Sequence, residues 1–156
     1  MAVREQLSDH EVVFRRLLDA PRELVWSVWT DPRHMDEWWG PIGFTTTTHE
    51  FSLVAGGAWR HNMHGPDGTD YPSVIVFREI VPPSRLVYDN AWSLQGVPID
   101  FAVVVLFGAE GAKTRLSLHI TFKDADAFKI AVERYRVLDG GTQTLDRRAA
   151  YVDSIA

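Results

Sequence analysis

The chain has 156 residues, a formal net charge of −5 and no cysteine. This length predicts a single domain, over residues 1–156, that buries roughly 68–70% of its unfolded surface. The lack of cysteine excludes disulfides, thiol catalysis and cysteine-based zinc sites, and the lack of a long basic run argues against a nucleic-acid-binding protein. No 18-residue apolar run and no signal-peptide segment appear, so we expect no membrane span and a cytoplasmic location.

The first part of the chain predicts one strand followed by two short helices. Residues 10–18 combine apolar positions with arginines and are typical of a strand. Pro21 suits the first position of a helix, with Asp19 or Ala20 near its cap. A second short helix is expected from Pro32, and Gly40-Pro41 ends it.

Residues 44–122 predict an antiparallel β-meander. The turn Gly65-Pro66-Asp67-Gly68 joins two strands into a hairpin within residues 56–72, because proline presets φ at a turn's second position and glycine tolerates the bend. The other predicted strands are residues 44–51, 73–80, 85–92, 99–107 and 114–122.

The last third of the chain changes to a helical period. Asp124 can cap a helix, and Gly140-Gly141 is expected to interrupt it. An apolar stripe then continues nearly to the C-terminus through Leu145, Ala149 and Val152. We expect this terminal helix to cover the concave face of the sheet.

The hairpin holds the most informative face in the sequence. Side chains alternate along a strand, so Trp59, His61 and Met63 share one face, and His64 lies on the other. A face that is large, adaptable and partly polar fits either a pocket wall or a core. The odd spacing of His61 and His64 places them on opposite faces, so we expect no metal site.

Two adjacent tryptophans form a second notable feature. Trp38 and Trp39 point in different directions if both are helical, so one should enter the core. Packing in the core is one interpretation of the pair. In the other, one tryptophan lies at a rim and acts as a lid over a cavity mouth, and the two interpretations are not exclusive.

Short motifs run in a fixed order along nearly the whole chain: RELVW at 22–26, DP at 31–32, WWGP at 38–41, GGAWR at 56–60, MHGPDG at 63–68 and EIVPPSRLV at 79–87. Together they resemble the AHSA-type family, named after the activator of the ninety-kilodalton heat-shock protein ATPase. The family lies in the SRPBCC superfamily of START-like, birch-pollen-allergen-like and polyketide-cyclase-like domains. The resemblance implies an α+β helix-grip fold, with a curved antiparallel sheet wrapped around a long C-terminal helix and a cavity between them. Two positions depart from the family pattern: Thr142 replaces a frequent aromatic residue and Arg148 a frequent leucine.

Three functions are compatible with this resemblance, because one fold serves many activities. The first is binding of a small hydrophobic or amphipathic ligand in the cavity, without a cofactor. The predicted ligand-binding residues are Trp39, Trp59, His61, Met63, Tyr71, Tyr88, Trp92, Phe101 and Tyr135. The second is a cyclase or aldol-type enzyme with His61 or Asp100 as base. The third is a co-chaperone-like module of the stress response, with a protein partner or a homodimer.

Overall fold

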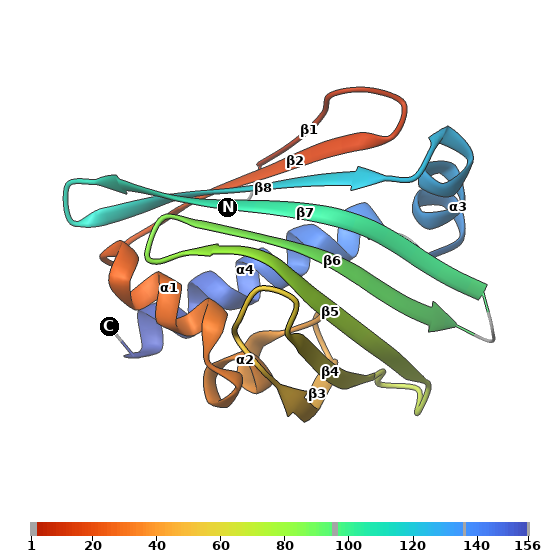
Figure 1. Ribbon diagram of the computed structural model, residues 1–156, viewed down its shortest axis with the longest axis horizontal. Helices are drawn as coiled ribbons and strands as arrows, with labels where there is room; N and C mark the ends of the chain where they lie inside the picture. The colour runs from red at the N-terminus through yellow and green to blue at the C-terminus, as the bar shows by residue number, and fades with distance from the viewer. Residues whose placement is uncertain (1–2, 95–96, 136, 156) are drawn as a thin grey trace.

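The computed structural model describes the backbone of residues 3–94, 97–135 and 137–155, with their side chains except at 92–99 and 134–137 (Figure 1). Its strands form one antiparallel sheet in the order β1-β2-β8-β7-β6-β5-β4-β3. The strands are β1 (Val3–Gln6), β2 (Glu11–Leu18), β3 (Thr45–Phe51), β4 (Ala58–His64), β5 (Asp70–Val81), β6 (Arg85–Leu94), β7 (Val97–Glu110) and β8 (Lys113–Phe122). The predicted meander is therefore confirmed, and β2 pairs with β8 at its end.

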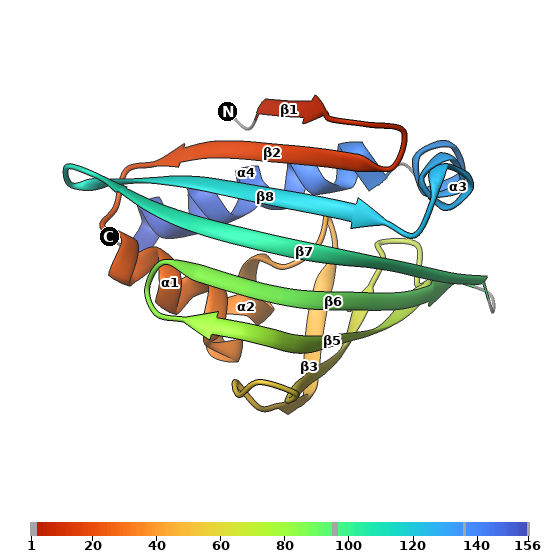
Figure 2. The same cartoon turned by 45° about the horizontal axis from the view of Figure 1, so that its top comes forward.

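Four helices are present in the described residues, all against one side of the sheet or at its edge. They are α1 (Arg22–Thr30), α2 (Pro32–Trp38), α3 (Ala125–Tyr135) and α4 (Val137–Ile155). Both ribbon views place α4 behind the strands, on the face toward which the sheet curves (Figures 1 and 2). This is the predicted α+β helix-grip architecture, with the terminal helix on the concave face.

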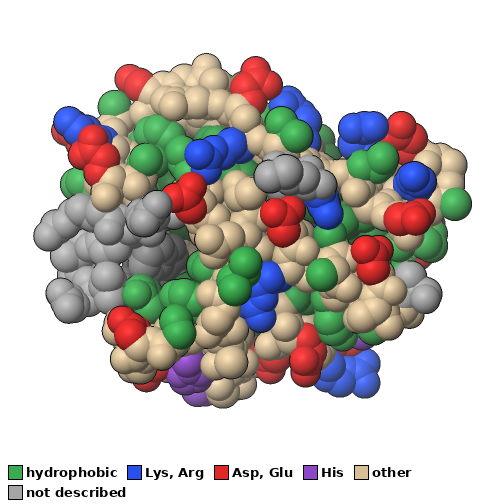
Figure 3. Space-filling view, turned by 180° about the vertical axis from the view of Figure 1, so that it is seen from behind, with side chains coloured by type: hydrophobic (Ala, Val, Ile, Leu, Met, Phe, Trp, Pro, Cys, Tyr) green, Lys and Arg blue, Asp and Glu red, His purple; other side chains and the backbone are tan. Residues whose placement is uncertain are grey.

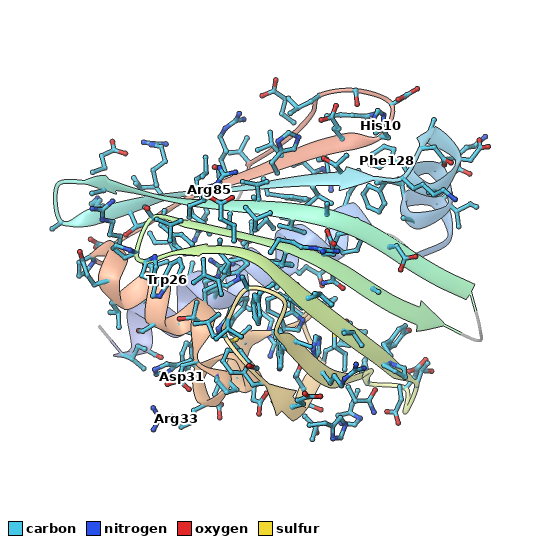
Figure 4. The ribbon with its side chains drawn as sticks, in the orientation of Figure 1. His10, Trp26, Asp31, Arg33, Arg85 and Phe128 are labelled. Carbon is cyan, nitrogen blue, oxygen red and sulfur yellow. The ribbon has the colours of Figure 1, made fainter. Side chains whose placement is uncertain are left out.

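The alternation of side chains along the strands builds the core. In β8, Leu116, Leu118, Ile120 and Phe122 are buried and the residues between them are more exposed. The buried row faces the helices, because apolar surface is removed from water only on the covered side of the sheet. Trp26 of α1, labelled in Figure 4, joins this core by packing edge-on against Phe107 at a centroid distance of 5.2 Å.

Local capping explains how the two short helices are joined. The side chain of Asp31, labelled in Figure 4, accepts a hydrogen bond of 2.9 Å from the backbone N–H of Arg33. It thereby caps α2, in which Pro32 is the first residue. In α1, by contrast, Pro21 is the N-cap and not the first helical residue, so the predicted boundary was off by one position.

The prediction that Gly140-Gly141 interrupts the terminal helix is wrong. The helix α4 runs through both glycines without a break, and α3 ends earlier, at Tyr135. The reason lies in packing: a Cβ atom on Gly141 would lie 2.8 Å from the ring of Phe14 in β2, inside the normal contact distance. Glycine is used here for a close approach of helix to sheet, not for a turn.

The strand β1 was not predicted, and its presence adds one strand before the strand that was expected to be the first. All four of its residues are exposed, so its sequence VREQ carries no apolar alternation. Backbone pairing with β2 alone places it at the edge of the sheet. As a result, the two short helices lie between β2 and β3 and not between the first two strands.

None of the described helices is both long and apolar enough to cross a lipid bilayer. On the side of the molecule seen in Figure 3, acidic and basic side chains are interspersed with hydrophobic ones.

The role of Gly141 can be tested against its neighbour. Alanine at either glycine should gain about 1 kcal/mol in helix propensity. At Gly140 the new methyl meets only Pro41 at an ordinary 3.4 Å, so Gly140→Ala should stabilise the protein. Gly141→Ala must displace the Phe14 ring, and we expect it to be less stable than Gly140→Ala by roughly 1–3 kcal/mol in urea unfolding. Equal stability of the two variants would contradict the packing argument.

Candidate functional site

Four tryptophans from three elements meet on the inner side of the sheet. Trp29 comes from α1, Trp38 and Trp39 from the end of α2, and Trp59 from β4. The centroid of Trp39 lies 6.0 Å from Trp29, 5.2 Å from Trp38 and 4.8 Å from Trp59. We call these four residues the tryptophan cluster.

Both Trp38 and Trp39 are buried, so the interpretation as core packing is confirmed and the alternative, in which one of them lies at a rim, is wrong. Trp38 is fully buried and Trp39 is 8% exposed. Trp39 lies just beyond α2 and has an extended backbone, with φ −67° and ψ 135°. Helical spacing therefore does not apply between the two residues, and the change of backbone direction turns both indoles inward. Trp39 is not a surface lid.

His61 is held between two members of the tryptophan cluster. Its ring stacks on Trp59 at a centroid distance of 3.7 Å and meets Trp39 edge-on at 5.9 Å. The residue is only 2% exposed, and neither ring nitrogen has a hydrogen-bond partner among the described residues. Buried polar groups normally have partners, so this one calls for an explanation.

Burial also sets the protonation state of His61. Loss of solvation lowers its pKa to about 4, and the charge of His49 acts in the same direction. The backbone of Trp59 opposes the shift without reaching hydrogen-bond geometry. At neutral pH the ring is therefore uncharged, with one nitrogen able to donate a hydrogen bond and the other able to accept one.

Other polar groups lie on the same inner face. Ser73 of β5 is directly opposite His61 in the sheet register, and its hydroxyl donates to the side-chain oxygen of Asn90 at 3.4 Å. Both residues are buried. Tyr88 of β6 is buried as well, and burial raises its pKa, which keeps its hydroxyl neutral. The inner face thus carries several neutral hydrogen-bonding groups within an apolar surrounding.

Arg148 approaches the tryptophan cluster from α4. Its guanidinium carbon lies 3.2 Å from the ring centroid of Trp29 and 4.5 Å from that of Trp38. The side chain is fully buried, and its three nitrogens have no hydrogen-bond partner in the described part of the chain. Burial lowers the pKa of Arg148, and the nearby Tyr88 acts against this shift.

The predicted ligand-binding residues separate into groups. Trp39, Trp59 and His61 are in mutual ring contact. The other described ones are on the inner face but at greater spacing along the sheet: Met63 and Tyr71, which are opposite each other in register, and Tyr88 and Phe101. The side chains of Trp92 and Tyr135 lie outside the described residues.

The candidate base Asp100 is not part of this site. It is exposed, while its neighbour Phe101 is half-buried and packs on Phe122 at 5.2 Å. Alternation along β7 therefore directs Asp100 to the outer face of the sheet. His64 is also directed away from His61, and is hydrogen-bonded to Thr47 and Asp70. No group of three or more His, Asp or Glu side chains suited to a metal ion is found in the described residues.

Four residues of the site were not predicted: Trp29, Ser73, Asn90 and Arg148. The sequence held a signal for the last of them. Arg148 follows Leu145 by three positions and precedes Ala149 and Val152, so it interrupts the apolar stripe of α4. Trp29 lies on the buried, apolar face of α1, and helical spacing alone does not show that this face also contacts α4.

The curved sheet around a terminal helix defines the helix-grip class. The family model "Activator of Hsp90 ATPase homolog 1-like protein" matches residues 19–153, so the chain belongs to this family, as its motifs predicted. No protein with a curated description matches the chain.

Solved structures of other proteins share this fold. A protein from Arthrobacter aurescens is 23% identical and superposes with a TM-score of 0.89, over 96% of this chain and 90% of that one. A protein from Mycobacterium smegmatis is 21% identical with a TM-score of 0.87, over 99% and 98% of the two chains. A protein titled AHSA1 from Silicibacter pomeroyi is 18% identical with a TM-score of 0.78, over 94% and 99%. At these identities the similarity establishes the fold.

The burial of His61 predicts a pH-dependent stability. In the unfolded state His61 has an ordinary pKa near 6.5, so it binds a proton as the pH falls below this value. In the folded state its pKa is about 4, so it stays neutral until the pH is much lower. Stability from this group is therefore present above pH 6.5 and lost as the pH falls toward 4. Between pH 7 and 4.5 the wild type should lose roughly 2–3 kcal/mol more than His61→Phe in urea unfolding. Parallel pH profiles for the two proteins would contradict the neutral, desolvated state of His61.

Proposed function

We propose that this chain binds a small amphipathic ligand between the sheet and α4. The tryptophan cluster would form an apolar wall, and His61 would supply a polar contact. The observation that carries the proposal is the pair of ring nitrogens on His61, buried and without partners among the described residues. A buried polar group left unpaired costs about 1–3 kcal/mol, and a ligand that bonds to it recovers part of this energy.

The surroundings of His61 fit this role. Ligand sites are mostly apolar and contain a few placed polar groups that fix orientation. Trp59 stacks on His61, Trp39 packs edge-on against it, and Ser73 lies opposite it in the sheet. Aromatic faces also give a large contact area at a small loss of side-chain entropy.

Binding is better supported than catalysis. A general base works best when its pKa is near the working pH, and burial lowers that of His61 to about 4. The other candidate base, Asp100, is on the outer face of the sheet. Neither of the two alternative bases therefore fits a cyclase-like reaction well.

The co-chaperone-like alternative finds less support on the side of the molecule seen in Figure 3. It requires an exposed apolar patch of several hundred Å². On the side seen in Figure 3, hydrophobic side chains are interspersed with charged ones. The matching family model is named after an activator of the Hsp90 ATPase. Binding of a protein partner by this chain is a second proposal, distinct from ligand binding.

Competition binding can test the role of His61. The neutral dye N-phenyl-1-naphthylamine should bind the wild type saturably, with 1-naphthol and naphthalene as competitors that differ by one hydroxyl. His61→Phe keeps an aromatic ring but removes both nitrogens. We expect it to weaken the binding of 1-naphthol by roughly fivefold to tenfold, which corresponds to the loss of about one hydrogen bond. The affinity for naphthalene should be nearly unchanged.

His64→Phe is the matched control, since it changes a histidine on the same strand but on the opposite face. It should leave both competitors unaffected. The absence of saturable dye binding to the wild type would contradict the proposed function. Equal weakening of naphthalene and 1-naphthol by His61→Phe would contradict His61 as the polar contact.

Met63 tests the extent of the apolar wall. It shares the inner face with Trp59 and His61 and is half-buried against the core. If it lines the ligand site, Met63→Ala should weaken dye binding several-fold while lowering stability by less than the roughly 2–5 kcal/mol of a fully buried methionine. Calorimetric melting and dye titration of the same sample measure both effects. A full loss of stability with unchanged binding would place Met63 in the core alone.

A further inference from the structure

A fully buried arginine without an acceptor is the least expected feature of the interior. Guanidinium groups remain charged in proteins, and buried charges are normally paired. Arg148 has no ion-pair or hydrogen-bond partner in the described part of the chain. Two other arginines differ from it: Arg147 donates to the carbonyls of Gly40 and Pro41. Arg16, whose Nε and Nη1 also lack hydrogen-bond partners in the described residues, has a carboxylate oxygen of Asp146 at 3.7 Å.

The aromatic contacts of Arg148 position its guanidinium but do not provide hydrogen-bond acceptors for it. Trp29 and Trp38 offer their ring faces to the guanidinium, and this cation–π attraction offsets part of the desolvation. The N–H groups, however, lie in the plane of the guanidinium and point away from its faces, so stacking leaves them without acceptors. The two indoles therefore fix the position of the planar Arg148 guanidinium and leave its N–H donors available to an acceptor.

From this geometry we infer that Arg148 binds the anionic group of the ligand, and that the ligand is a small aromatic or alkyl carboxylate. The inference rests on the proposed function and deepens it. A carboxylate accepts two parallel hydrogen bonds from one guanidinium. The tryptophan cluster would then contact the apolar body, with Arg148 at one end of the cluster and His61 at the other.

The charge of the site favours a monoanion over a phosphate monoester. Arg148 supplies one positive charge, whereas His61 and Tyr88 are buried and neutral. A carboxylate balances one charge. A phosphate monoester carries between one and a half and two negative charges at neutral pH, and part of this charge would be buried without a partner.

Two dyes with the same aromatic body test the inference. N-phenyl-1-naphthylamine is neutral, and 1-anilinonaphthalene-8-sulfonate adds one negative charge to it. The wild type should bind the sulfonate at least tenfold more tightly than the neutral dye. Arg148→Met, which keeps a long unbranched side chain, should lose this preference and bind the neutral dye as before. Arg148→Lys, which keeps the charge but not the fork, should retain part of it.

Arg115→Met is the matched control for net charge. Arg115 is exposed and paired with Glu110, so its removal changes the net charge equally but should leave the preference for the sulfonate dye intact. Competition by 1-naphthoate, 1-naphthyl phosphate and 1-naphthalenemethanol then identifies the headgroup, and the carboxylate should compete best. Strongest competition by the phosphate would overturn the assignment to carboxylates.

Stability separates a binding role from a purely structural one. Without ligand, Arg148→Met removes an unpaired buried charge, so its Tm should rise by roughly a few degrees. A lower Tm together with an unchanged dye preference would mean that the arginine serves only to pack against Trp29 and Trp38, and would overturn the inference. Saturable binding of the neutral dye with no preference for the sulfonate would overturn it too, while leaving the proposed function intact.

Discussion

The interior of this protein depends on how a cluster of tryptophans joins helices to the curved sheet. Indoles from α1, from the end of α2 and from β4 meet at centroid distances of 4.8–6.0 Å. Large aromatic side chains bury much apolar area with few rotatable bonds, so they can link elements that share little backbone contact. The hydrogen bond from the Trp38 ring to the carbonyl of Val28, at 3.0 Å, further fixes α2 against α1. Every polar group of the candidate site is then positioned relative to this apolar frame.

His61 and Arg148 are both buried against the tryptophan cluster, and both lack hydrogen-bond partners in the described residues. Each has hydrogen-bonding atoms in a place where water is excluded, and the rest of the described interior does not satisfy them. Natural cores contain few such groups, because each one lowers stability. Functional sites are where such local conflicts concentrate, and the proposed ligand contacts would account for both groups.

Much of the fold could be predicted from the sequence, whereas the site could be predicted only in part. Alternation along β4 placed Trp59 and His61 on the inner face, because a strand has a fixed period of two. The close approach of α4 to β2 was hidden, since a glycine pair in a helix looks like a turn until the facing residue, Phe14, is known. The inward turn of Trp39 was equally hidden, because it depends on a backbone change at the end of α2. Arg148 was visible as a departure from the family pattern, but its contacts join residues more than a hundred positions apart, which periodicity cannot reveal.

The contact between Gly141 and Phe14 has a geometric consequence for Arg148. Seven residues separate the two positions on α4, which is two helical turns, or about 10 Å along the axis, so both lie on the same face of the helix. The missing side chain at Gly141 lets the backbone of α4 rest directly on the Phe14 ring, and so sets how closely the helix approaches the sheet. The lack of a Cβ atom at Gly141 therefore helps to determine how deeply the Arg148 guanidinium lies between helix and sheet. A larger residue at 141 would have to displace the Phe14 ring or move α4 away from the sheet, so a position with no side chain sets how tightly the surroundings of Arg148 are packed.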